Sequence, residues 1–71
     1  MNRFPVSSSN LRSVGYDTQT IILEVEFNSG WVYQYLGVPY ALHVGLMGAS
    51  SKGSYLDTYI KKGGFKAVRI K

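Results

Sequence analysis

Side chains that could do catalytic chemistry are few and widely spaced in this 71-residue sequence. There is no cysteine, so neither a thiolate nucleophile nor a zinc–sulfur site can form. His43 is the only histidine, and catalysis by it would need a nucleophile or an orienting carboxylate, yet Asp57 is the only acid in the C-terminal half. Glu24 and Glu26 alternate with apolar residues, so they are expected on the solvent side of a strand. We therefore predict no enzyme activity, no metal site and no cofactor.

Aromatic side chains give a first indication of binding. Trp31, Tyr33 and Tyr35 recur at every second residue, so they share one face of a strand. If that face is exposed, the rings can stack on nucleobases, as in RNA-binding modules. If it is buried, the same rings pack within the core or across the hairpin. The pattern alone does not decide between the two interpretations.

Basic residues give a second indication, because they are concentrated near the C-terminus. Residues 1–49 carry two arginines against three acids, a net charge of −1, whereas residues 50–71 carry six cations against one acid, a net charge of +5. The cations of interest are Lys61, Lys62, Lys66, Arg69 and Lys71. We expect them to gather into one outward-facing surface that contacts phosphates in a salt-sensitive manner. A solvated C-terminal segment is the alternative explanation.

A third candidate is the segment Ser50–Ser54, whose small residues precede a predicted helix and include Lys52. Free N–H groups at a helix start, with a nearby cation, can hold a phosphate. The glycine–lysine–serine spacing of a Walker A loop is absent. An ordinary turn between helices with serine capping explains the segment equally simply.

Hydrophobic periodicity predicts an antiparallel sheet. Thr20–Phe27 alternates strictly, with Ile21, Leu23, Val25 and Phe27 on one face, and Asn28-Ser29-Gly30 is a hairpin turn before a returning strand, Trp31–Leu36. Asn10–Tyr16 is a weaker first strand, because Leu11, Val14 and Tyr16 do not share one parity. Either a bulge lies near Ser13, or Leu11 lies outside the strand.

Two short helices are expected to follow, over Tyr40–Ala49 and Ser54–Lys62, with Gly63-Gly64 ending the second. Gly45 lies inside the first helix, where a close approach by another element would account for it. Asp57 and Lys61 are spaced for an i, i+4 ion pair. The predicted fold is α+β: a three-stranded antiparallel sheet, or four strands if Phe65–Ile70 adds one, with both helices on one face.

The chain is expected to form a single domain over residues 1–71, with residues 1–9 as a lead-in that has little structure. Hydrophobic residues make up 45% and charged residues 17%, a globular balance. Residues 1–5 lack a long apolar run and no stretch is apolar enough to span a membrane, so we expect no signal peptide, a cytoplasmic location and no membrane partner.

Several short motifs follow one another along nearly the whole chain. They are Ser8-Ser9-Asn10-Leu11, Val14-Gly15-Tyr16-Asp17, Phe27-Asn28-Ser29-Gly30, Trp31-Val32-Tyr33-Gln34-Tyr35, Val38-Pro39, Ser51-Lys52-Gly53-Ser54-Tyr55 and Arg69-Ile70. Over about residues 6–70 this order resembles the KTSC domain, a small bacterial domain named for the C-terminus of some lysyl-tRNA synthetases. Its hallmark is a central Tyr-x-Tyr, here Tyr33-Gln34-Tyr35. The resemblance implies RNA as a suggested partner, because the family is attached to a synthetase, but the family has no established function and supplies no catalytic residues.

Together these observations favour a small RNA- or nucleic-acid-binding module. The residues expected to make the contacts are Tyr33, Tyr35, Lys52, Lys61, Lys62, Lys66 and Arg69. The alternative is a protein-interaction module, either a monomer that binds a protein partner or a weak homodimer, because aromatic residues are numerous for so small a core. A minimal hydrolase is disfavoured, since no nucleophile–base pair is available.

Overall fold

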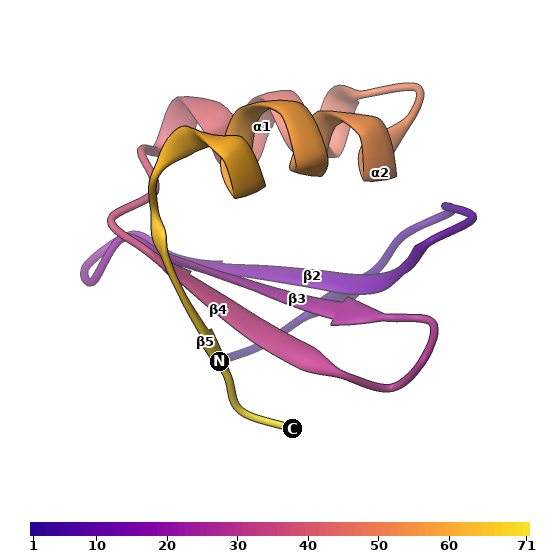
Figure 1. The fold of residues 1–71 in the computed structure, drawn as a ribbon, viewed down its shortest axis with the longest axis horizontal. Coiled ribbons are helices and arrows are strands. Elements are labelled where there is room, and N and C mark those ends of the chain that lie inside the picture. Colours follow the sequence, from indigo (N-terminus) through magenta and orange to yellow (C-terminus); the bar gives the residue numbers. More distant parts are fainter.

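The computed structural model describes all residues, 1–71, as a five-stranded antiparallel sheet with a helical layer on one face (Figure 1). The strands are β1 (Phe4–Pro5), β2 (Leu11–Asp17), β3 (Ile22–Phe27), β4 (Val32–Leu36) and β5 (Lys66–Arg69). Their order in the sheet is β1-β2-β3-β4-β5, and every neighbouring pair is antiparallel. The helices lie between β4 and β5 in sequence, so the chain leaves the sheet, crosses one face and returns to its edge.

Strands β2 and β3 form as the alternating pattern predicts. Leu23 and Val25 point into the core, and Tyr35 lies opposite Leu23 on β4. The register of β2 shifts between Leu11 and Ser13, so of the two alternatives the structure shows the bulge, with Leu11 inside the strand. The bulge explains why Leu11 and Val14 are both buried although their positions differ in parity.

The β2–β3 connection corrects one expectation. Asp17 Oδ1 accepts hydrogen bonds from the backbone N–H groups of Gln19 and Thr20, at 2.9 and 3.4 Å, and so closes the turn. The turn continues through Ile21, which has a φ of 53° and a half-exposed side chain. The prediction that Ile21 belongs to the strand was wrong, because turn geometry outweighs the β propensity of this residue. The predicted β3–β4 turn is confirmed, with Gly30 at a φ of 97°.

The helical layer comprises α1 (Tyr40–Gly48), α2 (Lys52–Tyr55), a π-helical turn η1 (Leu56–Ile60) and a 3-10 turn η2 (Lys61–Gly63). Gly64, with a φ of 83°, ends this run as the sequence predicts. The second helix therefore begins earlier than expected and changes hydrogen-bonding pattern along its length. A Cβ on Gly45 would lie 2.0 Å from the hydroxyl of Tyr55, so the close approach expected at this glycine is confirmed.

The core lies between the sheet and the helical layer. Its buried members are Leu11, Val14, Leu23, Val25, Tyr35, Val38, Leu46, Leu56 and Ile60. Leu46 of α1, together with Leu56 and Ile60 of η1, covers the face of β3 and β4 that the sequence alternation makes apolar. The predicted α+β class and the placement of the helices on one face are thus confirmed.

The strand count and the role of the N-terminus need correction. The sheet has five strands, not three or four, because β5 pairs with β4 and the expected lead-in supplies β1. Strand β1 has two residues and includes Pro5, so it gives almost no sequence signal. It passes close to β2 at Gly15, where a Cβ would lie 2.5 Å from the carbonyl oxygen of Asn2.

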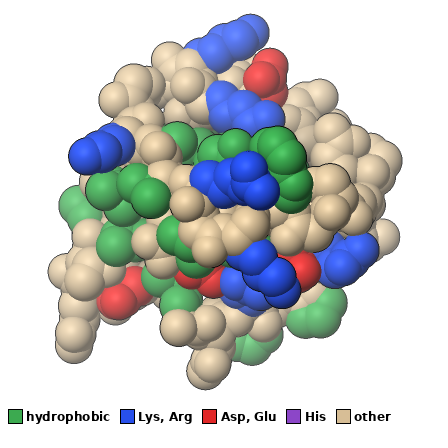
Figure 2. All heavy atoms as spheres, turned by 60° about the horizontal axis from the view of Figure 1, so that its bottom comes forward, with side chains coloured by type: hydrophobic (Ala, Val, Ile, Leu, Met, Phe, Trp, Pro, Cys, Tyr) green, Lys and Arg blue, Asp and Glu red, His purple; other side chains and the backbone are tan.

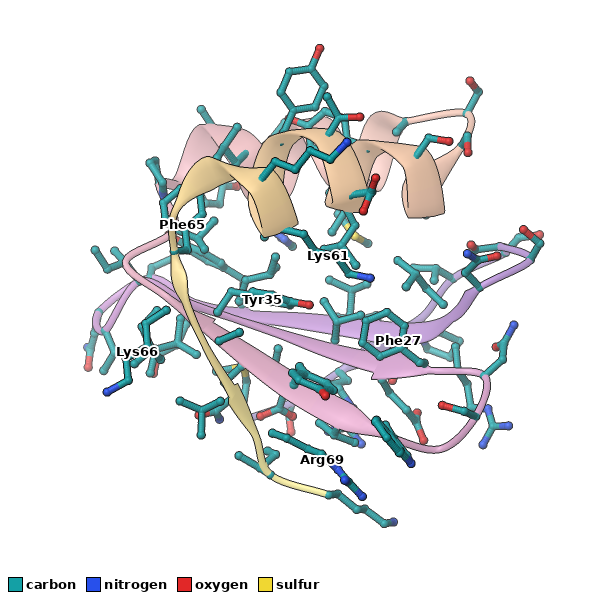
Figure 3. The ribbon with its side chains drawn as sticks, viewed as in Figure 1. Phe27, Tyr35, Lys61, Phe65, Lys66 and Arg69 are labelled. Carbon is teal, nitrogen blue, oxygen red and sulfur yellow. The ribbon has the colours of Figure 1, made fainter.

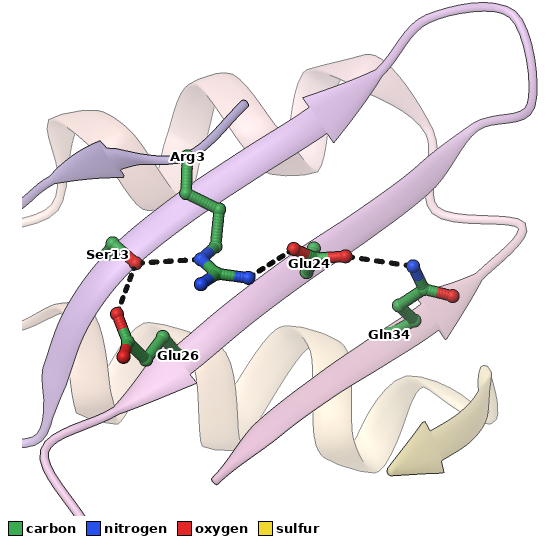
Figure 4. Close-up of polar contacts among 5 residues, drawn as sticks. All are labelled: Arg3, Ser13, Glu24, Glu26 and Gln34. Atoms are coloured by element: carbon green, nitrogen blue, oxygen red, sulfur yellow. Dashed lines mark hydrogen bonds and ion pairs between the residues drawn. The ribbon is translucent and has the colours of Figure 1, made fainter. Parts of the chain in front are cut away.

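The N-terminal segment also covers part of the polar face of the sheet, through Arg3 (Figure 4). Glu24 was expected to face solvent, yet it is only 4% exposed. The Arg3 guanidinium pairs with its carboxylate and also donates a hydrogen bond to Ser13 Oγ at 3.0 Å. Gln34 donates to Glu24 at 2.8 Å, and Ser13 donates to Glu26 at 2.8 Å. We call these five residues the polar network. It satisfies a carboxylate that an alternating strand alone would leave in water.

Candidate functional site

An aromatic groove of about 640 Å³ opens on the helix-covered side of the sheet, where the helical layer ends. We define the aromatic groove by its lining residues: Ser9, Asn10, Phe27, Asn28, Ser29, Trp31, Tyr33, Tyr35, Lys61, Phe65 and Ala67. A volume of this size lies within the range of small-ligand sites in proteins. No acid lines it.

Strand register explains why the rings meet here. Tyr33 lies opposite Val25 on β3 and opposite Arg69 on β5, so the Tyr-x-Tyr face is the core-facing side of the sheet. Tyr35 is 4% exposed, and burial raises the pKa of its hydroxyl, with the neighbouring Tyr33 adding to the shift. Tyr33 is only partly buried, and Phe27 meets it edge-on at a centroid distance of 5.9 Å. The Tyr-x-Tyr pair therefore divides, with Tyr35 mainly in the core and Tyr33 at the groove.

The π-helical turn η1 brings Lys61 to the groove (Figure 3). The predicted ion pair between Asp57 and Lys61 is absent; Asp57 instead pairs with Lys62, at 3.6 Å. A π turn brings residues five apart close together, which favours the Asp57–Lys62 pair over the i, i+4 pair. Lys61 is thereby free of any acid, and its ammonium lies 5.2 Å from the centroid of the Phe27 ring.

Arg69 is a second cation beside the groove; it is not a lining residue but stacks on Trp31, which is one. It lies opposite Tyr33 across the β4–β5 pair, and its guanidinium carbon is 3.8 Å from the centroid of the Trp31 ring. A stack this close fixes the orientation of the indole, which is otherwise about half exposed. Arg69 Nε donates to the Lys71 carbonyl at 3.3 Å, but the guanidinium pairs with no Asp or Glu side chain, so its charge is not neutralised by one.

The remaining predicted contact residues lie elsewhere. Lys66 is opposite Leu36, on the other face of the sheet from Arg69, and Figure 3 shows it pointing away from the groove. Lys52 donates to the Ala49 carbonyl at 3.1 Å, and Ser51 caps the short helix α2 by accepting from the Ser54 N–H at 3.4 Å. The Ser50–Ser54 segment thus has the contacts of an ordinary capped turn.

The expected single cationic surface does not form. Lys and Arg side chains are spread separately over the face shown in Figure 2, with acids between some of them. Cations close in sequence diverge in space: strand alternation puts Lys66 and Arg69 on opposite faces of the sheet, and the helical turn separates Lys61 from Lys62. Of the seven predicted residues, three line the aromatic groove, namely Tyr33, Tyr35 and Lys61, and a fourth, Arg69, adjoins it through its stack on Trp31.

Several groove residues were missed as site residues by sequence reasoning. Phe27 ends the alternating strand on the same face as Val25, and this parity was the available signal for it. Phe65 gave none, because only the turn at Gly64 folds it back onto the sheet. Asn10 and Asn28 join the groove because the lead-in contacts the β3–β4 turn, where the Asn28 side chain donates to the Ser9 carbonyl at 2.8 Å.

His43 lies on α1 and is not a lining residue of the groove. Its ring stacks on Tyr16 at a centroid distance of 4.9 Å, and burial lowers its pKa. Tyr16 in turn donates to the Val38 carbonyl at 2.6 Å, so its hydroxyl is engaged in holding the β4–α1 connection. The structure contains no group of three or more histidine, cysteine or acidic side chains that could hold a metal ion.

A five-stranded antiparallel sheet with one helical layer defines a small α+β domain. The KTSC domain model matches residues 7–65, and this chain belongs to the KTSC domain family. The chain is also similar in structure to a crystallised KTSC domain protein from Yersinia pestis. That similarity has a TM-score of 0.89 and 46% identity, covering 99% of this chain and 97% of the other.

The chain is similar to proteins of two kinds, one of its own length and one much longer. An uncharacterized protein from Stutzerimonas stutzeri is 41% identical over 70 residues, which is 99% of each chain. A lysine–tRNA ligase from Nostoc punctiforme is 40% identical over 62 residues, covering 87% of this chain but only 11% of the ligase. The domain is therefore found both by itself and as a small part of an enzyme. None of the helices in this chain is long and apolar enough to cross a membrane.

Proposed function

We propose that this domain is an RNA-binding module whose contact site is the aromatic groove with its two cations. The single observation that carries the proposal is the combination of partly exposed rings with acid-free cations in one hollow. Aromatic rings stack on any base, and cations beside them contact phosphates, which is the usual chemistry of single-stranded nucleic-acid sites. The relationship to a segment of a lysine–tRNA ligase, an enzyme that acts on an RNA, favours RNA over DNA.

Expected affinity follows from the number of available charges. With only Lys61 and Arg69 at the groove, binding should be weak, with a Kd between about 1 and 100 µM at low salt. Each phosphate contact to a single strand contributes a slope of about −0.7 in log K against log salt, so two contacts give about −1.4. A protein that used all the C-terminal cations would show a much steeper dependence.

The test is a salt titration of a labelled single-stranded RNA, followed by fluorescence anisotropy, with a matched pair of variants. Lys61→Gln should reduce affinity and lower the slope by about 0.7, because it removes one phosphate contact. Lys62→Gln changes the net charge equally but alters a side chain that pairs with Asp57 outside the groove, so it should leave the slope unchanged. Equal effects of the two substitutions, or no binding by the unaltered domain, would refute the proposal.

A protein-interaction module is the second candidate, favoured by a different surface. Tyr40 and Val44 of α1 and Tyr59 of η1 are each at least half exposed on the helical layer. Exposed aromatic and aliphatic side chains of this kind are typical of weak interfaces. Light scattering across a range of concentrations checks for self-association, and a strict monomer would exclude the homodimer.

A further inference from the structure

The architecture around the aromatic groove restricts how a nucleic acid can approach it. Open-sheet RNA-binding modules lay a strand across several exposed rings. Here the helical layer covers the same face of the sheet, and Leu56 and Ile60 pack against the residues of β3 and β4. Tyr35, at 4% exposure, cannot serve as a platform for a base lying flat on the sheet. A ligand can therefore reach the rings only at the aromatic groove, where the helical layer ends.

The size of the opening limits what can enter. About 640 Å³ is enough for a planar heterocycle with its sugar, and the helical layer over β3 and β4 prevents a rigid duplex from lying flat on the rings. Of the rings that line the entrance, Phe27 meets Tyr33 at 84°, whereas Trp31 and Tyr33 are inclined to each other by only 31°, so Phe27 stands upright against the surface of the other two. They form the walls of a slot and not a flat shelf.

The slot has polar groups that can bond to the edge of a base and cations that can contact its phosphate. The end of the slot near the β3–β4 turn carries Asn10, Asn28 and Ser29, which offer hydrogen-bonding groups for the edge of a base. Asn10 accepts from Ser9 Oγ at 2.9 Å through its amide oxygen, which leaves the amide N–H groups free to donate. Lys61 lines the slot on the helix side, and Arg69 adjoins its β5 side through the stack on Trp31, where a phosphate attached to the inserted nucleotide would pass.

We infer that the aromatic groove is a pocket for one unpaired nucleotide of an RNA, extruded from its strand and inserted beneath the helical layer. The inference rests on the proposed function and narrows its substrate class to RNA with a bulged, looped or terminal base. The base stacks on the aromatic walls, and its backbone crosses Lys61 and Arg69. A fully paired helix is excluded from the pocket, because unpairing must precede insertion.

Two RNA hairpins test this inference, one fully paired and one identical except for a single bulged adenosine. The bulged hairpin should bind more tightly by about five- to a hundredfold, the range expected for one stacked base. Trp31→Ala should remove most of that preference, and Trp31→Phe should retain part of it, because a smaller ring still stacks. Trp31 is about half exposed and outside the core cluster, so neither variant should unfold the domain.

Free nucleotides separate insertion from charge attraction. Adenosine 5′-monophosphate should shift the NMR signal of the Trp31 indole N–H in a roughly millimolar titration, whereas ribose 5-phosphate at the same concentration should not. If both hairpins bind equally, or both small molecules give the same shift, single-base insertion is refuted while RNA binding at Lys61 and Arg69 survives. If neither single-stranded RNA nor either hairpin binds, the proposed function itself is refuted.

Discussion

The two faces of the sheet both carry arginine, yet they use it differently. On the polar face, Arg3 pairs with the buried Glu24 and bonds to Ser13, so its charge is satisfied within the molecule. On the aromatic face, Lys61 and Arg69 lie over Phe27 and Trp31 and have no acid partner. The first arrangement stabilises the fold, and the second leaves charge available for a ligand.

The contrast between paired and unpaired cations shows that a net charge of +4 is not enough to identify a binding site. Arg3, Arg12 and Lys62 each pair with an acid, at Glu24, Glu26 and Asp57 respectively. What distinguishes the groove is the meeting of unpaired cations with rings in a concave surface. Substitutions on one face of the sheet should therefore leave the property carried by the other face unchanged.

Removing the cation of the polar network should have the largest effect. Arg3→Met leaves Glu24 buried with only Gln34 as a side-chain partner, and we expect a loss of about 2–3 kcal/mol in the free energy of unfolding. Urea denaturation measures this loss. Adding Glu24→Gln to the same chain should recover at least about 1 kcal/mol, since the uncompensated charge is gone. RNA affinity of the folded Arg3→Met protein should be unchanged, and a large loss would mean that the two faces are coupled.

Packing beneath the helical layer gives the next largest effect. Gly45→Ala places a methyl group against Tyr55, and overpacking should outweigh the gain of about 1 kcal/mol in helix propensity, for a net destabilisation of about 1–2 kcal/mol. Gly48, at the end of the same helix, has open space around its Cβ position, so Gly48→Ala is the matched control and should be neutral or slightly stabilising. Thermal denaturation of the two variants provides the comparison, and equal stabilities would contradict the observed α1–α2 packing.

Arg69 and Lys66 compare the two faces within one strand. Arg69→Gln should weaken single-stranded RNA binding by up to about 1 kcal/mol and should also free the Trp31 indole, which tryptophan emission can detect. Lys66→Gln alters the opposite face and should change neither quantity. A larger loss of RNA affinity in Lys66→Gln than in Arg69→Gln would place the RNA interface on the polar face and contradict the proposal.

The smallest effect concerns His43. Because burial lowers its pKa, the folded chain binds this proton less readily than the unfolded chain does. Stability is therefore complete above the ordinary pKa of 6.5, falls as the pH drops through that value, and levels off below the lowered pKa. The urea midpoint should decrease slightly on acidification from about pH 8 to about pH 6. His43→Phe retains a ring against Tyr16 and should abolish this decrease, whereas an unchanged profile would assign it to other groups.

Sequence reasoning predicted the parts of the fold that depend on local patterns. The alternation around Leu23, the bulge before Ser13 and the glycine-terminated helix all follow from periodicity and turn chemistry. Strand β1 escaped prediction because two residues with a proline have no periodicity, and its pairing depends on long-range contact with β2. The burial of Glu24 escaped for the same reason, since Arg3 reaches it only once β1 has joined the sheet.

The site was predictable only in part. Parity placed Tyr33 and Tyr35 on one face, but the helical layer decides that Tyr35 is buried and Tyr33 is at the groove. Charge counting identified a basic C-terminal third but could not separate Lys61 from Lys62. That separation depends on a π turn for which the sequence Leu56–Ile60 gave no signal.

The most direct test of the central claim is a map of backbone amide shifts of the isotope-labelled domain on addition of single-stranded RNA at low salt. The account predicts that the shifts cluster at the aromatic groove, around Phe27, Trp31, Tyr33 and Ala67, and that the amides of Ser13 and Glu24 remain unmoved. Shifts centred on the polar network, or no shifts at all, would contradict it.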